Sequence, residues 1–252
     1  MTPMMEQYFE IKRQYEGYLL FYRLGDFYEM FFDDAVLASR ELELTLTGRD
    51  CGEAERAPMC GVPFHSADTY IARLIEKGYK IAICEQTEDP ALAKGLVRRE
   101  VVRVITPGTL IESSMLPEQK NNYICSLYYS GVEFGLCFAD VSTARVSVTL
   151  IDGDNMDNRL INELATYMPR EAISNVSAVK FSAAADFLVS KNAIVNDNQP
   201  QKYEYDTCLA RIKAQFGESL REEILSSRAI VCATGALLSY LSETQKNDLP
   251  NI

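Results

Sequence analysis

The first fifteen residues carry apolar side chains at steps of three and four residues, at Met4, Tyr8, Ile11 and Tyr15. This spacing predicts an amphipathic helix over residues 3–15, with Thr2 as its cap and Pro3 at its first position. The next apolar runs are too short for helices and predict strands over residues 18–24 and 27–31. Between them, Gly25-Asp26 is a turn signal.

The pattern continues as alternating helix-like and strand-like segments up to residue 105. We expect a helix over 33–41, an extended segment over 42–47 and a charged loop over 48–57. A helix over 66–77, capped by Ser66 and closed by Gly78, is followed by strands over 79–84 and 101–105. The first part of the chain is therefore predicted to be a small mixed sheet with helices.

The second part begins with three short apolar runs, over 123–129, 133–141 and 144–151, joined by turn signals. They predict an antiparallel meander. Helices are expected over 155–167, 207–216 and 227–244, with short extended stretches at 172–173 and 178–181.

A segment rich in Pro, Gly, Ser and Asn separates the two parts. We therefore predict two domains, 1–110 and 123–252, joined by a linker over 111–122. With 252 residues, 47% of them hydrophobic, the chain can bury two ordinary cores. The predicted fold class is mixed α/β (α+β).

Cysteine and histidine usage argues against a metal centre. The seven cysteines are scattered without a Cys-x-x-Cys pair, and His65 is the single histidine. This is neither a zinc pattern nor a secreted disulfide framework, and local packing or capping is the expected role of His65. Without an apolar leader or a run of 18 apolar residues, we expect a cytoplasmic protein with reduced thiols and no membrane contact.

The net charge of −11 is evenly spread along the chain. Residues 1–115 contain 13 Lys and Arg against 19 Asp and Glu, and residues 116–252 contain 12 against 17. An acidic domain is repelled by phosphates, so the chain is not expected to hold DNA tightly by itself. Probing a duplex that another part of a protein holds remains compatible with this charge.

Phe27 and Glu29 stand two residues apart in a predicted strand, so both side chains point to the same side. An exposed ring can enter a base step, and a carboxylate beside it can bond to an exposed base edge. The alternative is that Phe27, Phe31 and Phe32 are rings of the core and that Glu29 is a solvated strand residue.

Four further segments surround this pair in a recognisable order: Leu19–Leu24, Ala57–His65, Ile83–Gln86 and Arg103–Thr109. Together with Gly25–Phe32 they resemble the N-terminal region of the MutS family of DNA mismatch repair proteins, and the resemblance runs from Thr2 to Ile252.

The resemblance implies that Phe27 is a stacking wedge and that Glu29 is the hydrogen-bonding partner of a mismatched base. It also implies DNA contacts for Arg49, Met59 and Gln86. Mismatched double-stranded DNA, a second MutS subunit and a MutL-type repair partner are the implied partners. ATP and magnesium are expected only in the full-length protein, because the family's clamp and ATPase regions lie C-terminal to the part that this chain matches. Arg23, Arg49, Gln86 and Arg99 are candidate donors to the DNA backbone or sugar, or else solvated surface.

The second domain resembles the ribonuclease H-like fold of MutS connector domains. That fold leaves a nuclease alternative open, which needs three or four converging carboxylates for two metals. The meander offers Glu133 and Asp140, without a further acid at a matching strand end, so a connector is favoured. With no phosphate-binding Gly-rich loop, the chain is not expected to be an enzyme. A module that only docks other proteins through its acidic surface is the second functional alternative.

Overall fold

The computed structural model describes residues 1–88, 95–110, 121–217 and 222–245. Its contacts divide the chain into two compact units, Met1–Thr106 and Pro107–Ile252. The predicted linker over 111–122 falls almost entirely outside the described residues.

The first unit is built on a six-stranded mixed sheet with the strand order β3-β4-β2-β1-β5-β6. β1 and β5 are parallel and the other neighbours are antiparallel. The strands are β1 (Leu19–Leu24), β2 (Phe27–Phe31), β3 (Thr47–Arg49), β4 (Ala57–Pro63), β5 (Ile81–Gln86) and β6 (Arg99–Ile105).

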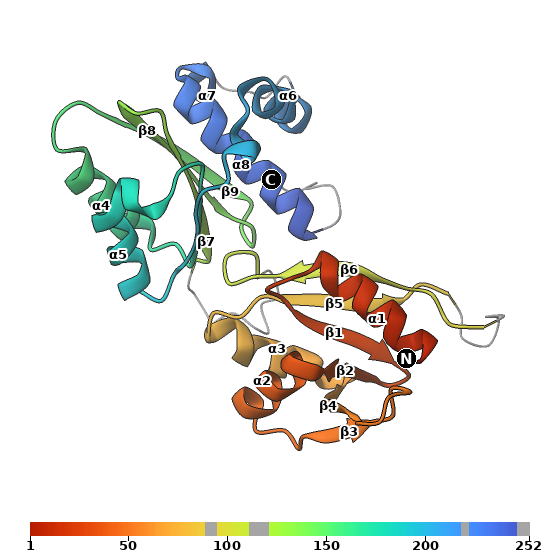
Figure 1. The fold of residues 1–252 in the computed structure, drawn as a ribbon. Coiled ribbons are helices and arrows are strands. Elements are labelled where there is room, and N and C mark those ends of the chain that lie inside the picture. Colours follow the sequence, from red (N-terminus) through yellow and green to blue (C-terminus); the bar gives the residue numbers. More distant parts are fainter. Residues whose placement is uncertain (89–94, 111–120, 218–221, 246–252) are drawn as a thin grey trace. The chain divides into compact units, whose positions relative to one another are not determined.

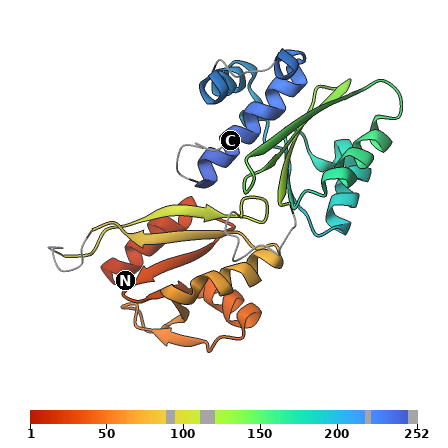
Figure 2. The same ribbon diagram turned by 180° about the vertical axis from the view of Figure 1, so that it is seen from behind.

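Helices cover both faces of this sheet (Figures 1 and 2). α1 (Pro3–Gln14) buries Met5, Tyr8 and Ile11, which are three residues apart, against one face. α2 (Phe32–Leu42) and α3 (Ala67–Glu76), the latter after the 3₁₀ turn η1 (Phe64–Ser66), pack on the other. Thr2 and Ser66 occupy the cap positions as predicted, but neither side chain makes a capping bond. The hydroxyl of Ser66 donates instead to the Pro63 carbonyl, 3.3 Å away.

Two predictions for the first unit are wrong. Residues 42–47 do not form the predicted strand, because α2 continues to the buried Leu42, the chain then turns through Glu43 in a left-handed conformation, and only Thr47 belongs to a strand, β3. The segment 48–57 is not wholly a loop, because β3 includes Gly48 and Arg49. Strand β4 was not predicted at all.

The second unit has a five-stranded sheet with the order β11-β10-β7-β8-β9. The predicted meander is present, and the remaining two strands extend it in parallel with β7. This is the strand arrangement expected of a ribonuclease H-like domain. The strands are β7 (Tyr123–Tyr129), β8 (Glu133–Asp140), β9 (Arg145–Asp152), β10 (Glu171–Ser174) and β11 (Ile194–Asn196).

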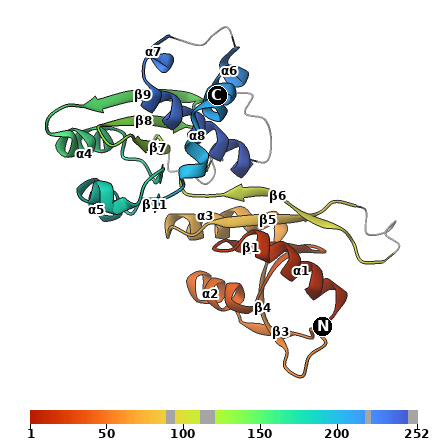
Figure 3. The ribbon, with the colours of Figure 1, turned by 45° about the horizontal axis from the view of Figure 1, so that its top comes forward.

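Two helix layers enclose this second sheet, as Figure 3 shows. One face packs against α4 (Met156–Tyr167) and α5 (Ser182–Ser190), and the other against α6 (Tyr205–Phe216) and α8 (Arg228–Gln245). The short elements are η2 (Ala178–Phe181), η3 (Pro200–Tyr203) and α7 (Glu222–Leu225). Residues 178–181, predicted as extended, form the 3₁₀ turn η2. Of its apolar residues Val179 is exposed and Phe181 is buried.

Candidate functional site

The predicted ring lies at the end of the β1–β2 hairpin. Gly25 and Asp26 form a two-residue turn, and Leu24 pairs with Phe27 as the last rung. Gly25 has a φ of +56°, a conformation that favours glycine at the first central position of such turns. The side chain of Phe27 is 46% exposed. The core interpretation of this ring is therefore excluded, and the ring is accessible to a partner.

The strand register places all five predicted site residues on the sheet face that α1 covers. They are Phe27, Glu29, Arg49, Met59 and Gln86. Glu29 pairs with Tyr22 on one side and with Gly61 on the other, and Met59 pairs with Phe31. Thr47 pairs with Met59, so Arg49 lies two residues further along β3 on that face. Cys84 pairs with Tyr22, so Gln86 also shares it.

Glu29 is already paired within the protein. Its Oε2 atom lies 2.5 Å from the Nη1 atom of Arg49, and the two side chains are 15% and 37% exposed. Gly61 leaves room for this carboxylate, because a Cβ there would lie 3.4 Å from Glu29 Cγ and 3.2 Å from the Tyr28 carbonyl. A base edge that bonds to Glu29 must therefore share it with Arg49 or displace it.

Met59 and Gln86 lie further from the ring. Met59 is half-buried opposite Phe31, four residues along β2 from Phe27, and its carbonyl accepts from the Thr47 hydroxyl at 3.0 Å. Gln86 is the half-buried last residue of β5, and β1 separates it from β2. The structure thus brings Arg49 to Glu29 and places Met59 and Gln86 on the flanks of the same face.

Two of the candidate cationic donors are structural. Arg99 is buried, with Nε donating to the Arg23 carbonyl at 2.8 Å and Nη1 to the Val97 carbonyl at 2.9 Å and to Gln7 at 3.1 Å. Its guanidinium also lies over the ring of Tyr22, 5.0 Å from the centroid. Burial raises the pKa of Tyr22 to about 12, so its hydroxyl stays protonated and donates to Gln7 at 2.6 Å. The burial of Arg99 excludes the solvated-surface alternative for this residue, and Arg23 is similarly enclosed; contact of either with DNA stays a prediction.

The acids of the nuclease alternative do not converge. Glu133 and Asp140 stand at opposite ends of β8, with their Cα atoms about 23 Å apart at the usual strand rise. Asp140 is fully buried and accepts from the backbone and hydroxyl of Ser142, at 3.0 and 2.6 Å. Within the described ranges, no three His, Cys, Asp or Glu side chains are grouped to hold a metal ion.

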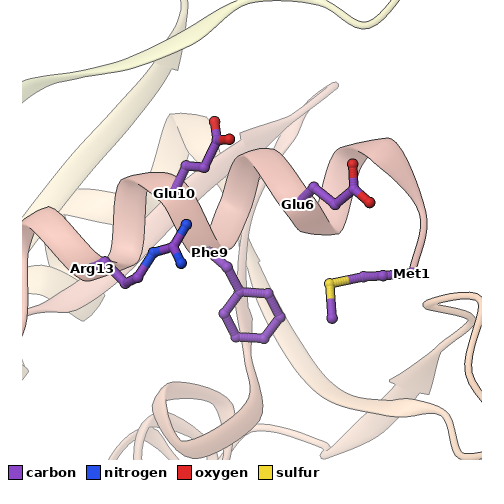
Figure 4. A pocket seen from close by; sticks show the side chains of 5 residues that line it. All are labelled: Met1, Glu6, Phe9, Glu10 and Arg13. Atoms are coloured by element: carbon purple, nitrogen blue, oxygen red, sulfur yellow. The ribbon is translucent and has the colours of Figure 1, made fainter.

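The outer side of α1 carries a hollow (Figure 4). It is lined by Met1, Glu6, Phe9, Glu10 and Arg13. The ring of Phe9 packs on Phe32, with centroids 4.9 Å apart, so this hollow is a gap beside a packed ring pair and includes none of the predicted site residues. Among the helices that the structure describes, none is long and apolar enough to cross a membrane.

Fold and site together define a protein of two mixed α/β units whose first unit presents an exposed ring and an ion-paired carboxylate on one sheet face. Residues 2–114 match the family model of MutS domain I, and residues 122–252 match that of MutS domain II. The chain belongs to the MutS family and comprises these two domains.

Similar proteins include the DNA mismatch repair protein MutS of Ruminiclostridium cellulolyticum, which is 51% identical over 252 residues. Those of Acetivibrio thermocellus and Caldanaerobacter subterraneus subsp. tengcongensis are 49% and 48% identical. Each match covers the whole of this chain, but the chain spans only 29% of the length of these relatives.

Proposed function

We propose that this chain is the mismatch-recognition and connector part of a cytoplasmic DNA mismatch repair protein, with Phe27 as the base-stacking wedge. The observation that carries the proposal is the 46% exposed ring at the tip of a hairpin, with Glu29 two residues away on the same face. Exposure of a phenylalanine leaves apolar surface in contact with water, and a wedge requires such an accessible ring.

The physical basis of selectivity lies in the DNA. Inserting a ring unstacks and kinks a duplex at a cost of a few kcal/mol per step, and the cost is least where pairing is already broken. A ring that reads no sequence therefore favours mismatches through deformability. Glu29 would then accept a hydrogen bond from the exposed base edge, while correctly paired DNA gives this carboxylate no such partner.

The other parts of the proposal concern the full-length protein. Arg49 would exchange between Glu29 and the DNA backbone, and Met59 and Gln86 would contact the duplex from the flanks. ATP and magnesium would act in regions beyond the two domains matched here, and this chain would not itself be an enzyme. A second MutS subunit and a MutL-type protein would be the protein partners.

The test is the ratio of affinities for mismatched and matched duplexes in the full-length protein. Phe27→Ala should remove most of this ratio, because one stacked base is worth about 1–3 kcal/mol. Its melting temperature should stay near the wild-type value, since the ring is exposed. Val36→Ala, which truncates an exposed side chain on α2, is the matched control and should change neither quantity.

An unchanged ratio in Phe27→Ala would contradict the proposal. It would favour the second candidate, a module that only docks other repair proteins. That candidate is supported by the net charge of −11, which disfavours contact with phosphates.

A further inference from the structure

The hairpin that presents Phe27 must resist the force of inserting a ring into a base stack. If the hairpin moves instead, the ring deforms the DNA less. Matched and mismatched duplexes then differ less in the deformation energy that binding requires. A recognition group of this kind needs a second layer of contacts that holds its backbone in place.

Arg23 contacts three parts of the molecule at this turn. Its Nε atom donates to the Gly25 carbonyl at 2.5 Å. The guanidinium lies on the face of the Phe64 ring, 3.7 Å from the centroid, and Nη1 is 3.6 Å from Glu85 Oε2. The side chain is only 17% exposed. With these partners it is held inside the unit and is not poised to reach a phosphate.

Two further bonds complete the enclosure. The backbone N–H of Phe64 donates to the Asp26 carbonyl at 2.9 Å, so both turn carbonyls are held. The Tyr28 hydroxyl donates to Glu85, the carboxylate that also faces Arg23. Burial, and then Glu85, raise the pKa of Tyr28, which keeps this hydroxyl protonated as a donor.

We infer that Arg23, stacked on Phe64 and held by Glu85, is a positioning residue that fixes the hairpin carrying the Phe27 ring. The inference rests on the proposed function. Arg23, Tyr28 and Glu85 lie on the sheet face opposite to Phe27 and Glu29, as strand alternation from the paired residues Tyr22, Glu29 and Cys84 requires. The support is therefore behind the ring, where DNA contacting Phe27 does not displace it.

The chemistry of the contact selects arginine. A planar guanidinium can lie flat on a ring while its Nε–H points at a carbonyl, and a lysine ammonium cannot do both. Arg23→Lys keeps the charge that faces Glu85 and removes this geometry. Phe64→Leu removes the ring and keeps an apolar side chain. Arg40→Lys, at an ion pair on α2 where the arginine side chain is 69% exposed, is the matched control.

The first readout needs no DNA. Hydrogen exchange of the amides of residues 24–28 should be about tenfold faster in Arg23→Lys and in Phe64→Leu than in wild type or Arg40→Lys. Exchange in α3 of the same unit should not change. Equally faster exchange throughout the unit would overturn the inference, because Arg23 would then stabilise the whole unit. Unchanged exchange at the hairpin would also overturn it, because Arg23 would then not hold the hairpin.

The second readout is the mismatched-to-matched affinity ratio of the full-length protein. In Arg23→Lys this ratio should fall about tenfold while affinity for matched DNA stays at the wild-type value. Equal losses on both duplexes, with a weaker salt dependence, would instead identify Arg23 as a phosphate contact and overturn the inference. If Phe27→Ala leaves the ratio unchanged, the proposed function fails, and the exchange rates still decide whether Arg23 fixes the hairpin.

Discussion

In the free protein the carboxylate of Glu29 forms an ion pair with Arg49. Glu29 Oε2 lies 2.5 Å from Arg49 Nη1, and both side chains are mostly buried. Repulsion of phosphates by this carboxylate is therefore weaker than an isolated acid would give. Removing the arginine should expose the full negative charge to the duplex. The two residues thus act as one unit, and single substitutions at either of them change the behaviour of both.

The first prediction at the residue scale concerns this pair. Glu29→Gln should raise the affinity of the full-length protein for matched duplex about two- to fivefold, and more than for mismatched duplex, because it removes the charge and keeps a hydrogen-bonding shape. The gain should be larger in an Arg49→Met background, where the carboxylate is not neutralised. Binding titrations of the four proteins give both values. Unchanged matched affinity in both backgrounds would rule out repulsion by Glu29.

The site was predictable in part from the sequence. The spacing of Phe27 and Glu29 within a short strand was enough to place them on one side, and the strand has the predicted bounds. The contact between Glu29 and Arg49 was not predictable from the pattern, since it depends on β4 lying between β2 and β3. Arg99 looked like surface because its partners, the backbone carbonyls of Arg23 and Val97, leave no sequence signal.

At the scale of elements, the missed strand β4 shows why propensity failed. Pro58, Gly61 and Pro63 all disfavour strands. The buried side chains of Cys60 and Val62 nevertheless hold the segment in the sheet between β2 and β3. At residues 42–47 the pattern instead predicted a strand that is absent. Leu42, Leu44 and Leu46 alternate as in a strand, but Leu46 is exposed, so this alternation marks no buried face.

The sheet of the first unit also predicts how stability depends on pH. Burial raises the pKa of Cys60 to about 11 and that of Cys84 to about 12. In the unfolded chain these thiols ionise near pH 9. Between pH 9 and the folded-state pKa values, the thiols of the unfolded chain are therefore ionised while those of the folded protein stay protonated. The stabilising contribution is complete below pH 9 and is lost as the pH rises toward 11–12.

Thermal denaturation followed by circular dichroism from pH 8 to pH 11 should therefore show a melting temperature that falls above pH 9. The Cys84→Ala variant should start lower, because a small cavity is created, but its melting temperature should decline less steeply with pH. A melting temperature that is constant up to pH 11 would show that these thiols do not ionise on unfolding in this range.

At the scale of the whole molecule, charge sets the limit on what the chain can do alone. Its net charge of −11 predicts weak DNA binding by these 252 residues at physiological salt. Any remaining affinity should fall steeply as salt is raised. Fluorescence anisotropy with matched and mismatched duplexes measures this, and nanomolar binding that resists salt would contradict the prediction.

The most direct test of the central claim is whether Phe27 stacks on the mismatched base. A fluorescent base analogue, 2-aminopurine, placed at the mispaired position should change its emission when the full-length protein binds, because stacking on a ring alters its fluorescence. The change should be lost in Phe27→Ala at saturating protein and kept in Val36→Ala. The same change in Phe27→Ala, with the complex formed, would show that another group contacts the base and that Phe27 is not the wedge.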